Sequence, residues 1–133
     1  MNRSPEEIAT ANEWSGKVIG AAIEVHKHLG PGLLESAYHA CLCRELELRG
    51  IPFQRQLLMA LEYKGLRVEN AYKIDVLIAG TVVVELKKAV EAIDPVHEAQ
   101  LLTYLRLSNL WLGLLINFHV PVLKDGIMRR VLG

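Results

Sequence analysis

The spacing of apolar residues predicts two helices in the N-terminal part of the chain. Apolar side chains recur every three or four positions over residues 14–29, as on the buried face of a helix. Residues 4–7 read Ser-Pro-Glu-Glu, an N-cap followed by a first-turn proline and glutamates, so we expect this helix to begin there. It should end at about His28, because two glycines and a proline follow at 30–32. The same spacing predicts a second helix, which Gly50 terminates.

A change to alternating apolar and polar residues predicts three strands after the helices. Alternation indicates a strand at 57–63, and a turn leads from it into a longer strand at about 66–78, with a bend expected near Asn70. A further turn leads into a third strand at 81–88. Strands joined by turns this short are expected to form an antiparallel meander.

The last part of the chain predicts one helix and two more strands. Asp94 and Pro95 form a cap and a first-turn proline for a helix that extends to about Leu107. The almost continuous apolar run at 111–118 fits a strand buried on both faces, and residues 127–132 fit an edge strand. The order α-α-β-β-β-α-β-β predicts a single α/β domain spanning the chain, with a mixed sheet of the α+β kind and helices packed against it.

Composition supports a folded domain and excludes several classes of function. Of 133 residues, 51% are hydrophobic and 23% are charged, which is enough to form a core and unlike a disordered chain. Fifteen basic and fifteen acidic residues cancel, which excludes binding to nucleic acid or membranes through bulk positive charge. We expect a cytoplasmic protein with no membrane association, because bilayer-spanning and signal-peptide segments are missing. Cys41 and Cys43 point to different sides of a helix and should stay reduced.

Charged residues interrupt two of the predicted strands, where their side chains are costly to bury. Asp75 stands in the apolar end of the strand at 66–78, and Glu85 and Lys87 stand in the next strand. An unpaired buried charge is strongly destabilising, so departures of this kind from local rules are typical of functional sites. Glu85 and Lys87 are two apart, so both side chains leave the same face of their strand.

The length of the loop between these strands decides whether Asp75 shares that face. A two-residue loop would pair Asp75 with Val84 and place Glu85 on the opposite face. A three-residue loop at 78–80 would pair Asp75 with Val83 and leave Glu85 diagonally adjacent on the same face. We predict the odd-length loop, because a glycine in its third position suits a type I turn followed by a glycine bulge.

Two carboxylates and a lysine on one face form an oxygen-rich site suited to Mg²⁺ or Mn²⁺. Such an ion polarises a phosphoryl oxygen and supplies hydroxide, and Lys87 would orient the water or stabilise developing charge. A salt-bridge cluster of the same residues at the strand ends, with no metal, fits the spacing equally well.

The same residues resemble a known nuclease motif. Asp75 followed by Glu85-Leu86-Lys87 is similar to the D…(D/E)-x-K motif of the PD-(D/E)XK nuclease superfamily. Gln100 and Tyr104 form the Q-x-x-x-Y pattern of the RecB-type exonuclease branch. Residues four apart share a helix face, so both side chains are able to point at the site.

A second motif resembles a smaller group within this superfamily. Residues 32–38 match the signature of the GxxExxY protein family, and the resemblance extends from about residue 19 to 132. From the residues alone, Gly32 is expected to serve a backbone turn and Tyr38 to pack in the core with its hydroxyl bonded. Glu35 either turns inward or is a solvated carboxylate at a helix start.

The resemblance implies a restriction-endonuclease-like core in which Asp75 and Glu85 bind the metal and Lys87 is the catalytic lysine. Glu35 would be an additional acidic metal ligand supplied by a helix, and the two residues of the Q-x-x-x-Y pattern would line the site. His97 lies on the same side of its helix as that pattern. It either approaches the metal or a phosphate, or caps and packs at the helix start, and we expect the latter.

We therefore expect a Mg²⁺- or Mn²⁺-dependent nuclease that acts on DNA or RNA. One alternative is a catalytically inactive nuclease-fold module that binds nucleic acid or a protein partner. Another is an interaction protein whose apolar surfaces form a homodimer. A homodimer is compatible with all three functions, because the domain is small.

Overall fold

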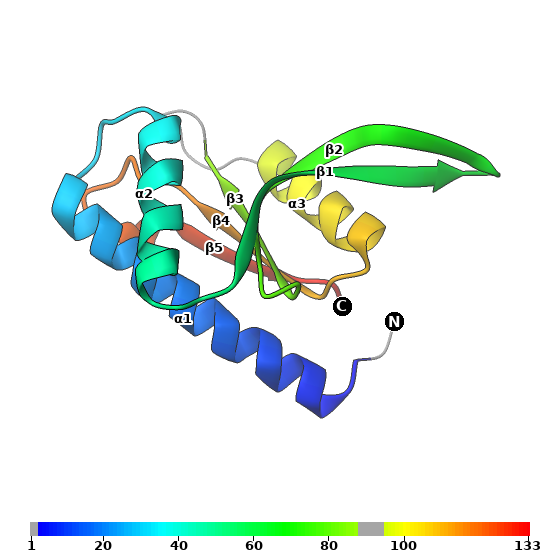
Figure 1. The fold of residues 1–133 in the computed structure, drawn as a ribbon, viewed down its shortest axis with the longest axis horizontal. Helices are drawn as coiled ribbons and strands as arrows, with labels where there is room; N and C mark the ends of the chain where they lie inside the picture. Colours follow the sequence, from blue (N-terminus) through cyan, green and yellow to red (C-terminus); the bar gives the residue numbers. More distant parts are fainter. Residues whose placement is uncertain (1–2, 88–94) are drawn as a thin grey trace.

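The structure is a computed structural model that describes residues 3–87 and 95–133. A sheet of five strands, in the order β1-β2-β3-β4-β5, forms its centre (Figure 1). The elements along the chain are α1 (Pro5–Leu29), α2 (Glu35–Leu48), β1 (Phe53–Tyr63), β2 (Leu66–Ile78), β3 (Val82–Leu86), α3 (Pro95–Ser108), β4 (Leu112–Ile116), the 3-10 helix η1 (Leu123–Gly126) and β5 (Ile127–Val131).

The strands of the sheet run in mixed directions. The pairs β1–β2, β2–β3 and β4–β5 are antiparallel, whereas β3 and β4 are parallel. A parallel pair needs a connection that returns the chain to the same end of the sheet, and α3 lies within that connection. The order of the elements and the mixed sheet confirm the fold class expected from the sequence.

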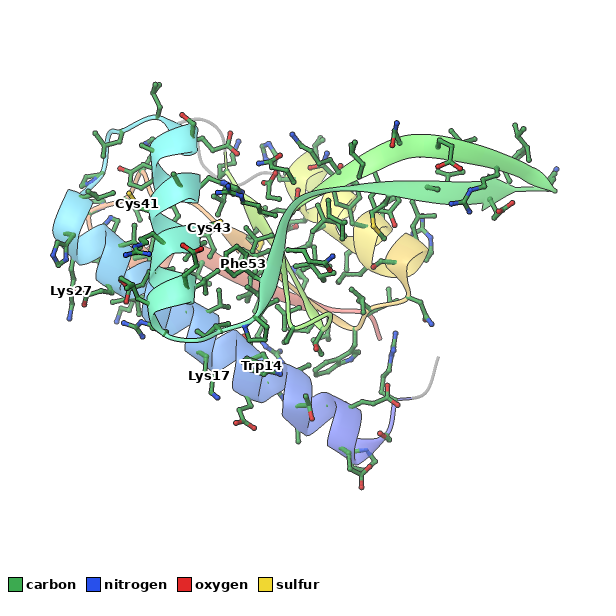
Figure 2. The ribbon with its side chains drawn as sticks, viewed as in Figure 1. Trp14, Lys17, Lys27, Cys41, Cys43 and Phe53 are labelled. Atoms are coloured by element: carbon green, nitrogen blue, oxygen red, sulfur yellow. The ribbon has the colours of Figure 1, made fainter. Side chains whose placement is uncertain are left out.

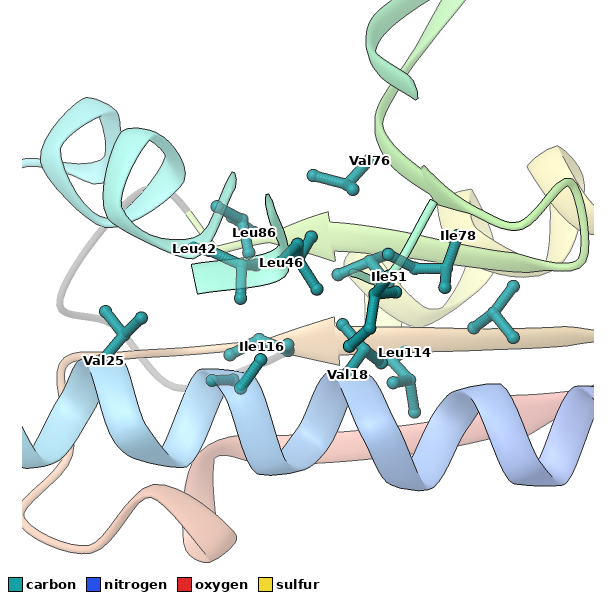
Figure 3. Close-up of a cluster of buried hydrophobic side chains, with 14 of the residues drawn as sticks. Val18, Val25, Leu42, Leu46, Ile51, Val76, Ile78, Leu86, Leu114 and Ile116 are labelled. Atoms are coloured by element: carbon teal, nitrogen blue, oxygen red, sulfur yellow. The ribbon is translucent and has the colours of Figure 1, made fainter. Parts of the chain in front are cut away.

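Two apolar clusters lie on opposite faces of the sheet. Val18 of α1 and Leu42 of α2 pack in one cluster, together with Ile78 and Leu114 of the sheet (Figure 3). Leu101 of α3 packs in the other cluster. The strands β3 and β4 contribute alternate residues to the two clusters, so both of their faces are buried. This burial explains the almost continuous apolar runs of their sequences.

The observed ends of the elements agree closely with those expected. The first helix ends at Leu29, one residue beyond the expected end. β1 begins at Phe53, earlier than the expected start. The sequence did not reveal this start, because the first residues of the strand are mostly exposed and show no alternation of apolar and polar side chains. β4 ends at Ile116, before the end of the apolar run. The expected strand residue 88 and the expected helix cap Asp94 lie outside the described residues.

The long hairpin of β1 and β2 is bent where the sequence predicts a bend. Asn70 has a φ of 51°, and the pairing register shifts between Met59 and Leu61. Between the pairs that these two residues form, β2 has two more residues than β1, and a bulge of this kind bends the strand and increases the local twist. Residues 59–72, which we call the arm, extend away from the rest of the sheet (Figure 1).

Cys41 and Cys43 lie on α2 and are both free, with Cys43 buried and Cys41 partly buried (Figure 2). Among the described residues, no helix combines the length and the apolar character needed to cross a bilayer.

Candidate functional site

A cavity of about 590 Å³ lies at the end of β3 and is lined by the first turns of α2 and α3. Its wall combines acidic, basic, amide and aromatic side chains. The structure brings together six of the residues singled out from the sequence, which line this one cavity: Glu35, Asp75, Glu85, Lys87, Gln100 and Tyr104.

The hairpin between β2 and β3 explains how the two acidic residues meet. Ile78 pairs with Val82, so the loop has the predicted odd length, but it comprises residues 79–81 and not 78–80. Continued by one step, this register places Asp75 opposite Glu85, and the predicted pairing of Asp75 with Val83 was wrong.

The turn itself also differs from the one we predicted. Ala79 and Gly80 have φ values of 50° and 65°, whereas the central residues of a type I turn have negative φ. The Thr81 N–H donates to the carbonyl of Ile78 at 2.8 Å and closes the turn one residue later than expected. The loop therefore keeps its odd length with a different backbone, and the two acids still share a face.

Asp75 and Glu85 are held by reciprocal hydrogen bonds to each other's strand. The backbone N–H of Asp75 donates to Glu85 Oε2 at 2.8 Å, and the N–H of Leu86 donates to Asp75 Oδ2 at 2.9 Å. These bonds lie just beyond Val76 and Val84, the last regular pair between the strands. The carboxylates thus accept hydrogen bonds from backbone N–H groups at the point where the regular strand pairing ends. The other carboxylate oxygens, Asp75 Oδ1 and Glu85 Oε1, take no part in these two bonds.

Glu85 lies in an environment that disfavours its ionised form. It is 8% exposed, and burial, followed by the negative charge of Asp75, raises the pKa of Glu85 to about 8. The charge of Glu35 acts in the same direction, while the hydrogen bond from the Asp75 amide and the charge of Lys73 act against it. A cation bound between the carboxylates would offset this repulsion.

The donor set fits a hard divalent cation that keeps much of its water. Among the described residues, no three His, Cys, Asp or Glu side chains are grouped closely enough to hold a metal ion together. Asp75 and Glu85 together offer two carboxylates, which suits Mg²⁺ because this ion is often bound by one or two carboxylates plus water and phosphate. The role of Glu35 as a further ligand stays a prediction.

Lys87 is held inside the cavity by a histidine. It is 5% exposed, and its Nζ lies 2.9 Å from Nε2 of His97, which is in the first turn of α3. We expected His97 to cap or pack at the helix start, but its ring lines the cavity. The sequence gives no sign of this contact, because it depends on how α3 is placed against β3.

Gln100 and Tyr104 both line the cavity, as their spacing on a helix predicts. Tyr104 packs against Tyr72 of β2 with ring centroids 4.9 Å apart. Burial, and then the charges of Glu85 and Asp75, raise the pKa of Tyr104. The phenol group of this tyrosine is therefore close enough to interact electrostatically with both carboxylates.

Gly32 and Tyr38 do not line the cavity, and they shape the loop that precedes Glu35. Gly32 has a φ of 101°, a conformation that glycine adopts most easily. The Tyr38 hydroxyl donates to the Gly30 carbonyl at 2.5 Å and accepts from the Leu33 N–H at 3.1 Å. Its ring stacks on Phe118 at 4.5 Å, so both residues have the structural surroundings that we expected.

Three polar residues of the cavity wall were not identified from the sequence: Ser36, His39 and Gln56. Lys73 also lines the cavity, and it stands two residues before Asp75 on the same strand face. His39 was detectable, since it follows Glu35 by one helical turn. Gln56 was not, because its φ of 51° departs from the regular strand.

Comparison with known proteins gives one match to a family. Residues 12–131 match the family model described as the PD-(D/E)XK nuclease superfamily. No curated protein matches the chain. Among solved structures, "Crystal structure of SSO0001" is similar over 93% of this chain, with a TM-score of 0.49 and 18% sequence identity. This chain spans 61% of the length of that chain.

Proposed function

The chain belongs to the PD-(D/E)XK nuclease superfamily, and we propose that it is a divalent-metal-dependent nuclease that hydrolyses phosphodiester bonds in DNA or RNA. The observation that carries this proposal is the convergence of Asp75, Glu85 and Lys87 on one cavity wall, from two adjacent strands. Membership of the superfamily supports a nuclease-type function and a nucleic-acid substrate.

Asp75 and Glu85 would hold Mg²⁺ or Mn²⁺ through the oxygens that lie outside their bonds to the backbone. The bound ion would supply Lewis-acid polarisation of the phosphoryl group and a lowered pKa for water. Because both carboxylates are tied to backbone amides, they are oriented before a substrate arrives. Glu35 adds negative charge to the same cavity and would act on the ion through a bridging water.

Lys87 would stabilise the negative charge that develops on the phosphate, or orient the attacking water. Its ammonium group is almost completely buried, where a charge acts more strongly than in water. The contact with His97 restricts the position of Nζ, so the charge is directed at a defined place in the cavity.

Several features of the wall favour binding of a phosphate group. The first turns of α2 and α3 face the cavity, and helix N-termini carry partial positive charge and unpaired N–H groups. Lys73 adds a positive charge on the face of β2 that carries Asp75. Gln100 supplies an amide that is able to donate to a phosphate oxygen.

A nuclease assay on single- and double-stranded DNA and RNA, with Mn²⁺ or Mg²⁺, tests this function. We expect metal-dependent cleavage that falls at least ~100-fold in Lys87→Ala, because one preorganised charge at the reacting centre contributes on this scale. Asp75→Asn should abolish cleavage. The matched control is Lys17→Ala, which removes a lysine on α1 that stacks over Trp14 (Figure 2) and should leave cleavage unchanged.

The outcomes of this assay separate the proposals. Cleavage that persists in Lys87→Ala would show that another site, or a contaminant, is responsible. Metal-dependent binding of nucleic acid with no turnover on any substrate would support the second candidate, a catalytically inactive binding module. That candidate is compatible with the bonds that backbone amides donate to Asp75 and Glu85, because these bonds join the two strands whether or not the site turns over.

A further inference from the structure

The backbone of Asp75 lies where the sheet is interrupted on both sides. Toward β1, the regular pairing skips Gln56 and Asp75, and Gln56 has a φ of 51°. Toward β3, the regular pairing stops at Val76 and Val84. Strand partners therefore do not fix the peptide of Asp75, and side chains must supply its hydrogen bonds.

Two side chains do so. Glu85 Oε2 accepts from the N–H of Asp75, as described above. On the other peptide group, Nε2 of His39 lies 3.2 Å from the carbonyl oxygen of Asp75. His39 is on α2, is 9% exposed and lines the cavity, so this bond joins α2 to β2 at the candidate metal site.

The same ring nitrogen also contacts Gln56, and the contact with the Asp75 carbonyl selects between the two tautomers, because a carbonyl oxygen only accepts. The side-chain amide nitrogen of Gln56 lies 3.2 Å from Nε2 of His39. One ring nitrogen cannot donate to a carbonyl and accept from an amide at the same time. The bond to Asp75 therefore requires a proton on Nε2 of His39, with the amide of Gln56 turned so that its oxygen faces the ring.

We propose that His39 is a positioning residue, which donates from Nε2 to the Asp75 carbonyl and thereby fixes the carboxylate of Asp75 for metal binding, with Gln56 as a second acceptor. The carbonyl and the side chain share one Cα atom, so holding the peptide plane restricts where the carboxylate points. This inference rests on the proposed function, because it assigns Asp75 to the metal.

Titration with Mn²⁺ alone, followed by calorimetry, tests the role of His39 without requiring turnover. His39→Ala should weaken Mn²⁺ binding on the order of 10–100-fold, as loss of groups that orient metal ligands commonly does. His39→Gln keeps an N–H donor at similar reach and should restore most of the affinity. Equal Mn²⁺ affinity in His39→Ala and the wild type would overturn the proposal while leaving the proposed function intact.

His26 provides a matched control within the same chain. It is a buried histidine of α1 whose Nε2 lies 2.8 Å from the carbonyl oxygen of Val120, outside the cavity. His26→Ala should lower the melting temperature of the metal-free protein as His39→Ala does, but leave the Mn²⁺ affinity unchanged. If His26→Ala weakens Mn²⁺ binding as strongly, the effect of His39 is one of general stability and the proposal is wrong.

The tautomer can be measured in the wild-type protein, so the proposal stays testable if His39→Ala does not fold. Nitrogen NMR shifts of the imidazole ring should show the proton of His39 on Nε2, and a proton on Nδ1 alone would contradict the assigned bond. Failure of the wild type to bind Mn²⁺ would overturn the proposed function and the metal-positioning role together. In that case a proton observed on Nε2 would still show that His39 donates to the Asp75 carbonyl, and a proton on Nδ1 alone would show that it does not.

Discussion

At the scale of single residues, the environment of Glu85 couples the candidate site to pH. Its pKa is about 8 in the folded protein, against an ordinary value of 4.5, because of burial and the charge of Asp75. Between these two values the folded state binds more protons than the unfolded state, so the free energy of unfolding falls as the pH rises. The stabilising effect of the bound proton is fully present below pH 4.5 and is lost as the pH rises through about 8.

We therefore predict that metal-free protein loses more stability between pH 5 and pH 8 than Glu85→Gln does, by on the order of 3 kcal/mol. Glutamine still accepts the bond from the Asp75 amide but does not titrate. Urea denaturation at both pH values measures the difference. Glu13→Gln, an exposed α1 variant, should retain the wild-type slope, and parallel curves for the wild type and Glu85→Gln would contradict the prediction.

The contact between His97 and Lys87 gives a second residue-scale prediction. Loss of a hydrogen bond to a charged group costs about 1.5–3 kcal/mol, which corresponds to roughly 10–100-fold in rate when it acts on the transition state. His97→Ala should lower cleavage on this scale and affect Mn²⁺ affinity much less, because Nε2 of His97 contacts Nζ of Lys87, the group that would act on the phosphate or the attacking water. Calorimetry and the nuclease assay measure the two effects. His28→Ala, on the exposed end of α1, is the control, and a loss of Mn²⁺ affinity in His97→Ala would count against this role.

At the scale of elements, close packing of α3 on β4 positions the site residues of that helix. A Cβ atom added to Gly113 would lie 2.7 Å from Cδ1 of Leu101, the residue next to Gln100. The absence of a side chain at Gly113 thus lets the helix approach the strand closely. The positions of Gln100 and Tyr104 depend on this approach.

Gly113→Ala should destabilise the protein by about 1–3 kcal/mol, because the added methyl group overpacks the contact with Leu101. It should also lower cleavage, since α3 must shift. Thermal and urea denaturation measure the first effect. Gly16→Ala is the matched control: a Cβ there meets nothing within 4 Å, so this helical position should gain roughly 0.5–1 kcal/mol. An unchanged stability of Gly113→Ala would contradict the close packing.

At the scale of the whole molecule, the arm is the feature that extends furthest from the core (Figure 1). It exposes apolar side chains, with Tyr63 60%, Leu66 61% and Val68 37% exposed. Its charged side chains are mostly paired with each other, since Arg67 contacts both Glu62 and Glu69. This surface fits a protein partner better than a nucleic-acid backbone.

The homodimer expected from the size of the domain stays a prediction, and the arm gives it a specific test. Sedimentation should show concentration-dependent association of the wild type that Leu66→Glu abolishes, because the charge would be buried in the interface. Leu48→Glu, at the exposed end of α2, is a control that should leave association unchanged. A wild type that remains monomeric at all concentrations would exclude this dimer.

Much of the fold could be predicted from local patterns in the chain. The capped start of α1, the glycines that follow it, the bend at Asn70 and the motif of Asp75, Glu85 and Lys87 all depend on neighbouring residues or fixed spacings. The start of β1 could not be predicted, because its exposed residues carry no alternation. The spacing of Gln100 and Tyr104 was sufficient to place both on one helix face.

The sequence by itself determined the elements, their order and the family, and it singled out the acidic pair with its lysine, because each of these rests on local patterns and fixed spacings along the chain. Only the tertiary structure decided the pairing of Asp75 with Glu85, the bonds that both acids make to backbone amides, and the presence of His39 and His97 beside them. These contacts join separate elements, and their geometry follows from how the helices pack on the sheet and from a one-residue choice in a turn.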